Sequence, residues 1–227
     1  MQRLSNNALK IIAMVTMVCD HVGVALFPEV SWLRILGRLA FPIYAFMIAE
    51  GCRHTRSMGR YFGAMVILAV ICQIVYYVAM ESLYMCILVT FSLSIGLIWL
   101  LKHAESTKKP IWYLAFFTGV CGVLLLCELF PEWIPTTDFY VDYGFLGVMI
   151  PVCIYAAKTR QSQILVALLA LVVLSATSDR NQWWCLLAIP LLLLYNGQRG
   201  KWKLKWFFYL FYPVHLVVIQ GIAMLMQ

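Results

Sequence analysis

Charge is scarce in this sequence. Only 12% of its 227 residues are charged, whereas 63% are hydrophobic. Soluble domains carry about 25% charged residues, so this composition excludes an ordinary soluble protein. Strand-like alternation of apolar and polar residues is also absent, and runs such as "LAFFTGVCGVLLLCELF" are apolar on every helical face, as is typical of helices in lipid. We therefore predict an all-α membrane protein.

Paired cysteine motifs are lacking as well. The eight cysteines are scattered, mostly inside apolar runs, and no CxxC pair occurs. This pattern favours small apolar packing residues over disulfides or metal ligands, and we predict no metal site. No linker or low-complexity segment divides the chain, so we predict one domain over residues 1–227. No small-residue cleavage site follows the first apolar run, and we expect that run to remain as an uncleaved helix.

Apolar segments fill most of the chain. A helix needs about 20 predominantly apolar residues to cross the hydrocarbon core of a bilayer. We predict a polytopic membrane helix bundle of about nine transmembrane helices, at residues 8–27, 32–51, 62–81, 83–102, 111–129, 142–158, 162–178, 182–196 and 204–226.

Basic residues are distributed unevenly between the connections of these segments. Fourteen of the 17 lysines and arginines fall in the N-terminal segment or in alternate connections: Arg3, Lys10, Arg53, Arg56, Arg60, Lys102, Lys108, Lys109, Lys158, Arg160, Arg199, Lys201, Lys203 and Lys205. Because basic connections stay in the cytosol, we predict a cytosolic N-terminus and, with nine spans, an external C-terminus. The basic residues sit in short connections between spans, so binding of nucleic acid is not expected.

Ionisable residues inside the predicted spans need an explanation, since each charge there costs at least about 2.5–3.5 kcal/mol. Asp20 and Arg38 lie at similar depth on two antiparallel neighbours, and we predict an ion pair between them. This pair does not require His21, which is adjacent to Asp20 in the sequence. A histidine beside a carboxylate has the parts of a general base. The alternative for His21 is a buried residue with a structural role only.

Polar residues in other spans form a second group of candidates. His215 lies in the last span two residues after Pro213, and a proline frees the carbonyl four residues before it. Pro42 does the same to the carbonyl of Arg38. As candidates for binding the acceptor substrate we take His215, Tyr212, Asp142, Tyr143, Gln73 and Tyr76. Interhelical hydrogen bonding and an exposed polar loop with interfacial tyrosines are the alternatives for the last four.

A basic cluster follows the second predicted span. The segment "EGCRHTRSMGRY" contains Glu50, Arg53, His54, Arg56 and Arg60. Arginine suits bidentate recognition of phosphate, so this cluster is a candidate site for a phosphorylated ligand. The first cytosolic connection is expected to be basic in any case, and membrane topology alone is the alternative explanation.

Four separated segments resemble one known family. "LKIIAMVTMVCDHVG", "LRILGRLAFPIYAFMIAEGCRHT", "FYVDYGFLGVMIPV" and "FFYLFYPVHL" are similar to the TraX family of bacterial membrane proteins, in order and over nearly the whole chain. The resemblance implies a multi-pass protein of the bacterial cytoplasmic membrane, in contact with membrane lipid. It also implies an acyltransferase that uses cytosolic acetyl-CoA and carries its key histidine in the first span, a position that His21 matches. The family name comes from acetylation of a pilin N-terminus, but the acceptor here could equally be a glycan, a lipid or a small amine.

Our leading hypothesis is a membrane-embedded acetyltransferase with His21, Asp20 and Arg38 as its catalytic residues. His21 would deprotonate the acceptor or carry the acetyl group, and Arg38 would stabilise the thioester oxyanion or hold Asp20. The basic cluster, including Glu50, would bind acetyl-CoA. A proton-coupled transporter that uses the same ionisable residues is one alternative, and a noncatalytic assembly factor for pili or envelope complexes is another.

Overall fold

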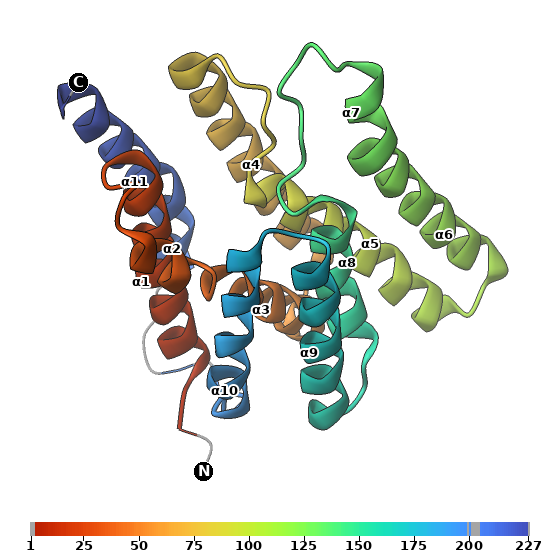
Figure 1. Ribbon diagram of the computed structural model, residues 1–227. Coiled ribbons are helices and arrows are strands. Elements are labelled where there is room, and N and C mark those ends of the chain that lie inside the picture. Colours follow the sequence, from red (N-terminus) through yellow and green to blue (C-terminus); the bar gives the residue numbers. More distant parts are fainter. Residues whose placement is uncertain (1–2, 199, 201–204, 227) are drawn as a thin grey trace. The chain divides into compact units, whose positions relative to one another are not determined.

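The computed structural model describes residues 3–198, 200 and 205–226, and its regular elements are all helices (Figure 1). Within those ranges no strand forms, and two isolated bridges join Leu4 to Tyr195 and Met85 to Val141. The prediction of an all-α chain is confirmed. The eight cysteines are all free thiols, and five of them are buried, as expected for packing residues.

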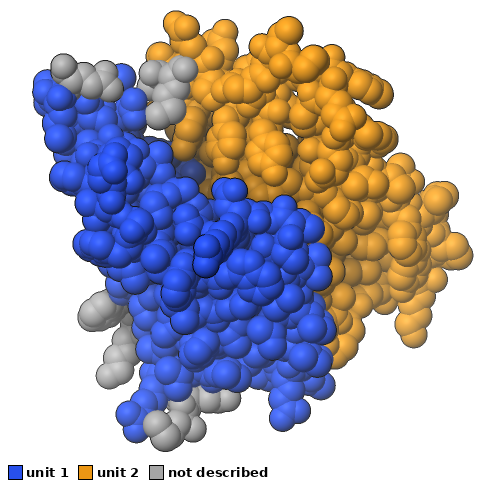
Figure 2. Space-filling model, in the orientation of Figure 1, with its two compact units in different colours: residues 1–47, 159–227 blue, residues 48–158 orange. Residues whose placement is uncertain are grey.

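The described chain forms two compact units (Figure 2). Unit 1 comprises residues 1–47 and 159–227. It contains α1 (Asn6–Ala25), α2 (Ser31–Gly37), the first half of α3 (Ala40–His54), α9 (Arg160–Ala176), η2 (Arg180–Leu187), α10 (Ala188–Leu193) and α11 (Lys205–Met226). Unit 2 comprises residues 48–158, with the rest of α3, α4 (Met58–Met80), α5 (Ile87–Thr107), α6 (Pro110–Leu124), η1 (Leu125–Leu129), α7 (Phe130–Trp133) and α8 (Gly144–Ala156). The prediction of one domain stays a prediction.

Each predicted span coincides with helical residues, but the count of nine is not confirmed. Among the described residues, five helices are long and apolar enough to cross a membrane: Asn6–Ala25, Ser31–His54, Met58–Val78, Ile87–Thr107 and Pro110–Trp133. Shorter apolar helices cover Gly144–Ala156, Arg160–Ala176 and Leu210–Met226. The predicted span 182–196 is a 3₁₀ helix followed by the six-residue α10. The predicted start of the fourth span at residue 83 was too early, because α5 begins at Ile87.

Local sequence signals set several helix ends. Ser5 caps α1 by accepting the N–H of Ala8 at 3.3 Å. Thr159 and Ser162 form a capping box at the start of α9, and Pro110 occupies the first turn of α6, where its missing N–H is harmless.

Basic side chains close the C-terminal ends of three helices. In unit 2, Arg53 donates to carbonyls at the end of α8, and Lys102 donates to the carbonyl of Cys52 near the end of α3 at 2.8 Å. In unit 1, Arg160 donates to the carbonyl of Leu192 in the last turn of α10 and to that of Tyr195, two residues after the helix ends. A cation at a helix C-terminus is stabilised by the macrodipole and by unpaired carbonyls. These residues therefore have a packing role beyond the orientation signal read from the sequence.

Within unit 1 the N-terminal segment lies beside the chain that follows α10. Arg3 and Leu4 donate their backbone N–H groups to the carbonyl of Leu194, each at 2.9 Å, and Asn196 donates to the carbonyl of Leu4. These two segments were predicted to share one side of the membrane, and they do share one end of unit 1. Which side that is stays a prediction. Arg199, Lys201 and Lys203, which supported the same prediction, lie outside the described residues.

Candidate functional site

Helices α1 and α2 approach one another closely at the polar residues of the first span. A Cβ added to Gly37 would lie 2.3 Å from both Cβ and Oδ1 of Asp20, and one added to Gly23 would lie 2.9 Å from Cβ of Leu33. Only glycine permits such approach, which is typical of helix pairs packed through small residues. The Asp20 carboxylate is thereby placed against the backbone of α2.

Asp20 is paired with Arg34, not with Arg38 as the sequence predicted. Nη1 of Arg34 lies 2.9 Å from Oδ1 of Asp20, and the two side chains are 31% and 23% exposed. The physical reason is distance from the connecting loop. Asp20 lies in the last turns of α1, and Arg34 lies in the middle of the seven-residue α2, so the two antiparallel positions meet. Arg38 lies one turn further along the chain.

Arg38 sits where the second predicted span breaks. Helix α2 ends at Gly37 and α3 begins at Ala40, so that Pro42 falls in the first turn of α3, where proline is tolerated. The sequence predicted a broken backbone turn beside Arg38, and residues 38 and 39 form a turn that interrupts the helical segment Ser31–His54 between α2 and α3. At the break, Nη1 of Arg38 donates to Oε1 of Gln182 in η2 at 3.1 Å.

The rings of His21 and His215 meet through one nitrogen of each, although 194 positions separate the two residues in the sequence. Nδ1 of His21 lies 2.8 Å from Nε2 of His215, and the ring planes are 4° apart with centroids 4.9 Å from one another. Nδ1 of His215 lies 2.9 Å from the carbonyl oxygen of Phe211. His215 is 7% exposed. A hydrogen-bonded chain thus runs from the ring of His21 on α1 through the ring of His215 to the backbone of α11.

These two contacts determine which ring nitrogens of His21 and His215 carry a proton when both rings are neutral. A carbonyl oxygen only accepts hydrogen bonds, so Nδ1 of His215 must carry a proton and donate to Phe211. Nε2 of His215 then has a lone pair, and Nδ1–H of His21 donates to it. This leaves Nε2 of His21 unprotonated, and no described residue donates a hydrogen bond to it. His21 therefore presents the lone pair that a general base or a nucleophile needs.

Aromatic rings surround the histidine pair. Phe211 stacks on His215 with centroids 4.9 Å apart, and Tyr212 packs edge-on against both histidines at 5.4 and 6.3 Å. Tyr212 itself is buried. Of the residues predicted for the acceptor, His215 and Tyr212 therefore do lie with His21.

Comparison with known proteins identifies the family. The family model described as TraX protein matches residues 5–223. The chain belongs to the TraX family. This confirms the resemblance read from the four sequence segments, and it covers both units.

Two relatives of this TraX-family chain have different descriptions. The protein "Probable fimbrial assembly protein FimC, serogroup H1" of Dichelobacter nodosus is 25% identical over 248 aligned residues, which cover 96% of each chain. An uncharacterized protein of Rickettsia prowazekii (strain Madrid E) is 26% identical over 156 residues, covering 69% of this chain and 57% of that protein. No solved structure matches.

The other acceptor candidates of the TraX-family chain lie in unit 2, around the segment that joins α4 to α5. Gln73 donates to the carbonyl of Tyr84 at 2.8 Å and accepts the N–H of Cys86 at 3.4 Å. Tyr76 packs near the ring of Tyr84 with centroids 6.4 Å apart. The backbone of Asp142 donates to the carbonyl of Met85 at 3.0 Å. Both hydrogen bonds of Gln73 go to the backbone of the segment that joins α4 to α5, so they hold that segment against α4.

Tyr143 and Gly147 shape the start of α8. Tyr143 has a left-handed backbone, with φ at 61°, and a Cβ added to Gly147 would lie 2.4 Å from its Cβ. Gly147 also faces Thr90 of α5, whose hydroxyl donates to the carbonyl of Asp142 at 2.7 Å. Gly147 therefore lets the start of α8 lie against α5 within unit 2.

The basic cluster of unit 2 divides into engaged and exposed side chains. Nη1 of Arg53 donates to the buried Glu50 at 3.1 Å, and Nη2 faces three carbonyls at the end of α8. His54 is 70% exposed and lies 3.7 Å from the same carboxylate. Arg56 and Arg60 are exposed. Phosphate binding by the cluster stays a prediction, but both terminal nitrogens of Arg53 already have partners.

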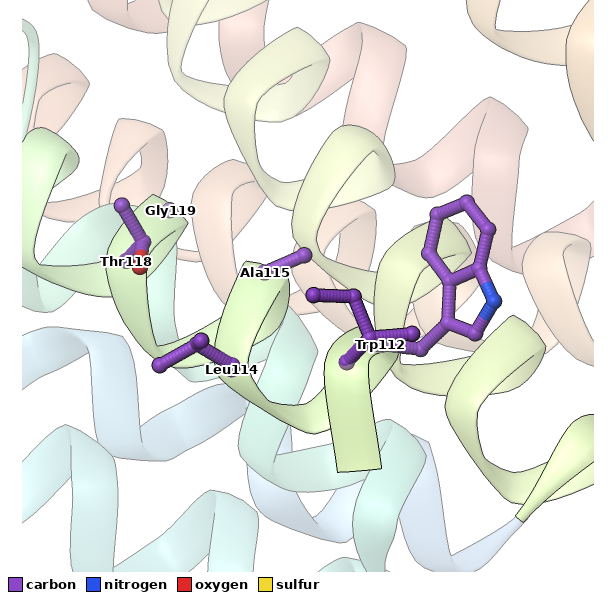
Figure 3. Close-up of a pocket in the computed structure, with 6 residues that line it drawn as sticks. Trp112, Leu114, Ala115, Thr118 and Gly119 are labelled. Atoms are coloured by element: carbon purple, nitrogen blue, oxygen red, sulfur yellow. The ribbon is translucent and has the colours of Figure 1, made fainter. Parts of the chain in front are cut away.

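A pocket of unit 2 lies along α6. It has a volume of about 520 Å³ and is lined by α6 residues, including Trp112, Leu114, Ala115, Thr118 and Gly119 (Figure 3). Its lining has no titratable side chain. No group of three metal-ligating side chains occurs within the described part of the chain.

Proposed function

We propose that this TraX-family chain is a membrane-embedded acyltransferase that moves an acetyl group from acetyl-CoA to an amine or hydroxyl. The proposal depends on the lone pair on Nε2 of His21, which the hydrogen bond between Nδ1 of His21 and His215 leaves free of a proton. The apolar helices of the chain and its family support a multi-pass location in the bacterial cytoplasmic membrane.

In the base route, Nε2 of His21 removes a proton from the acceptor N–H or O–H as that atom attacks the thioester carbonyl. A C–N or C–O bond forms, the C–S bond breaks, and the proton on His21 passes to the departing thiolate of CoA. General base catalysis of this kind contributes about 10²–10⁴ in rate. While protonated, His21 shares its charge with His215 through their 2.8 Å contact.

His215 acts in this scheme as a positioning residue. It accepts from Nδ1 of His21 and so holds the ring in the tautomer that leaves Nε2 free of a proton. The Asp20 carboxylate contacts Arg34, and no contact among the described residues joins it to the His21 ring. The same lone pair would serve a route in which His21 carries the acetyl group, since that route also needs an unprotonated Nε2.

Acetyl-CoA is a polyanion, and exposed arginines suit its phosphates. Arg56 and Arg60 are the exposed members of the basic cluster and are the best supported contacts for the donor. For the acceptor, the relative described as a probable fimbrial assembly protein favours a pilin amine, with a glycan, lipid or small amine as the other classes to test.

A proton-coupled transporter is the second candidate, because two hydrogen-bonded histidines also suit proton passage. The two functions differ in their requirement for acetyl-CoA. A transporter would move protons across a vesicle membrane without it, whereas the proposed enzyme would release free CoA only with an acceptor present.

The test is acetyl transfer by purified wild-type protein supplied with radiolabelled acetyl-CoA. The acceptors are a pilin-derived peptide with a free N-terminus, a sugar and a small amine. We expect labelled product and stoichiometric CoA, with a loss of about 10²–10⁴ in His21→Ala at matched protein levels. The control is His103→Ala, since His103 lies in unit 2 and packs on Trp112. Wild-type turnover in His21→Ala would refute the role of His21, and no labelled product from the wild type would refute the enzyme.

A further inference from the structure

Two buried donors in unit 1 have no partner. Nη1 of Arg38 donates to Oε1 of Gln182, and an arginine offers only donors, so the amide oxygen must face it and the amide nitrogen must face away. Nε of Arg38 and Nε2 of Gln182 are both buried and have no hydrogen-bond partner among the described residues. Gln182 is 3% exposed.

Orphaned donors of this kind are rare in folded proteins. The great majority of buried N–H groups are paired, and an unpaired one in a native structure asks for an explanation. Here the two belong to side chains that already contact each other at 3.1 Å, one on the break between α2 and α3 and the other on η2. Because the two unpaired donors belong to side chains in contact, they indicate a single binding site.

The charge balance indicates what this feature would bind. The positive charges of Arg34 and Arg38 both act on Asp20, but the Asp20 carboxylate contacts Arg34. Arg38 has no hydrogen bond to a carboxylate among the described residues and donates to the neutral amide of Gln182. The three charged groups therefore carry one net positive charge beside two unused N–H donors. An oxygen that bears negative charge fits this environment best.

The geometry points to Arg38 and Gln182 as a two-donor site for a negatively polarised oxygen, namely the carbonyl oxygen of the acyl group. The identity of this ligand rests on the proposed function. When the acceptor attacks the carbonyl carbon, an electron pair moves onto this oxygen, and the two N–H groups stabilise it. The pair returns to the carbonyl when the C–S bond breaks. Preorganised donors act most strongly where charge develops in the transition state.

The competing explanation is that Gln182 only anchors Arg38. Gln182→Glu separates the two, because it keeps an acceptor oxygen for Arg38 and removes the outward amide donor. The anchoring role predicts unchanged or higher thermal stability with unchanged turnover. The oxygen site predicts a fall in kcat of about 10²–10³ with little change in KM and no loss of stability. Gln163→Glu is the matched control, since Gln163 is a buried glutamine of unit 1 on α9.

A measurement without transfer tests the site itself. Acetate carries both an acetyl group and a negative oxygen, so it should raise the Tm of the wild type by about 2 °C over chloride at equal ionic strength. Gln182→Glu should show no rise, and Gln163→Glu should behave like the wild type. Equal acetate shifts in wild type and Gln182→Glu, or unchanged turnover in Gln182→Glu, would overturn the site. A wild type that binds acetate at this site yet transfers no acetyl group would refute the proposed enzyme and leave the oxygen site standing.

Discussion

The two units treat the same residue types differently. In unit 2, Arg53 directs its two terminal nitrogens to a carboxylate and three carbonyls. In unit 1, Arg38 has one amide partner and an unpaired Nε. The glutamines repeat the contrast, since Gln73 in unit 2 uses both its amide oxygen and its nitrogen, whereas the nitrogen of Gln182 in unit 1 is orphaned. Saturated polar groups hold a scaffold together, and unsaturated ones retain the capacity to bind.

The contrast predicts that Arg53 contributes to stability more than any other basic residue of its cluster. Arg53→Met removes the guanidinium group that donates to the buried Glu50 and to the carbonyls at the end of α8. We expect a loss of about 3 kcal/mol in the free energy of unfolding, as for other broken buried pairs. Thermal unfolding in detergent measures it. Arg56→Met removes an exposed arginine nearby and should change stability by no more than about 0.5 kcal/mol. Equal stability of the two variants would remove the scaffold role of Arg53.

In unit 1 the corresponding test should affect rate more than stability. His215→Ala removes the acceptor that holds the tautomer of His21, and we expect acetyl transfer to fall about 100-fold. His215→Gln offers a carbonyl oxygen to Nδ1–H of His21 and should restore part of the rate. If His215 had a packing role only, the alanine and glutamine variants would differ in Tm and not in turnover.

Close packing of α1 on α2 gives a smaller effect. Gly37→Ala places a methyl group 2.3 Å from atoms of Asp20, which must move together with its partner Arg34. Overpacking of this kind costs about 2 kcal/mol, measured as a lower free energy of unfolding. Gly221→Ala in α11 is the control, since nothing lies within 4 Å of its added Cβ. If both substitutions are equally tolerated, the helices do not approach as described.

The smallest expected effect is a pH dependence in the loop that precedes α8. The Ser82 hydroxyl and the Leu83 N–H donate to Asp138 and hold the pKa of its carboxyl below the ordinary 3.8. A lowered folded-state pKa means that this contact is present above pH 3.8 and is lost as the pH falls through the lower value. Hydrogen exchange at the Leu83 amide, corrected for intrinsic rates, should quicken there in the wild type. Asp138→Ala should exchange fast at every pH; pH-independent protection in the wild type would contradict the contact.

Sequence reasoning succeeded where apolar runs and local signals decide the outcome. The helices, their approximate limits and the family could be predicted from the sequence. The roles of Asp20, His21 and His215 stay predictions. Arg34 was missed as the partner of Asp20, although its shorter distance from the connecting loop was a usable signal. Gln182 was missed for a different reason: nothing in a single sequence shows that a short 3₁₀ helix lies against the break after Gly37. Contacts across 144 positions, such as that of Arg38, come from tertiary packing alone.

The distance of 194 positions between His21 and His215 has a consequence for biosynthesis. At a translation rate of about 5–20 residues per second, about 10–40 s pass between the synthesis of His21 and that of His215. During that time the Asp20–Arg34 ion pair can already form, because both residues belong to one helical hairpin. The two charges are therefore paired before the rest of the chain is made. The imidazole of His21 has no such local partner and gains its fixed tautomer only when the ribosome has finished α11. A chain stopped short of α11 would therefore lack the His21–His215 contact on which the proposed acetyl transfer depends.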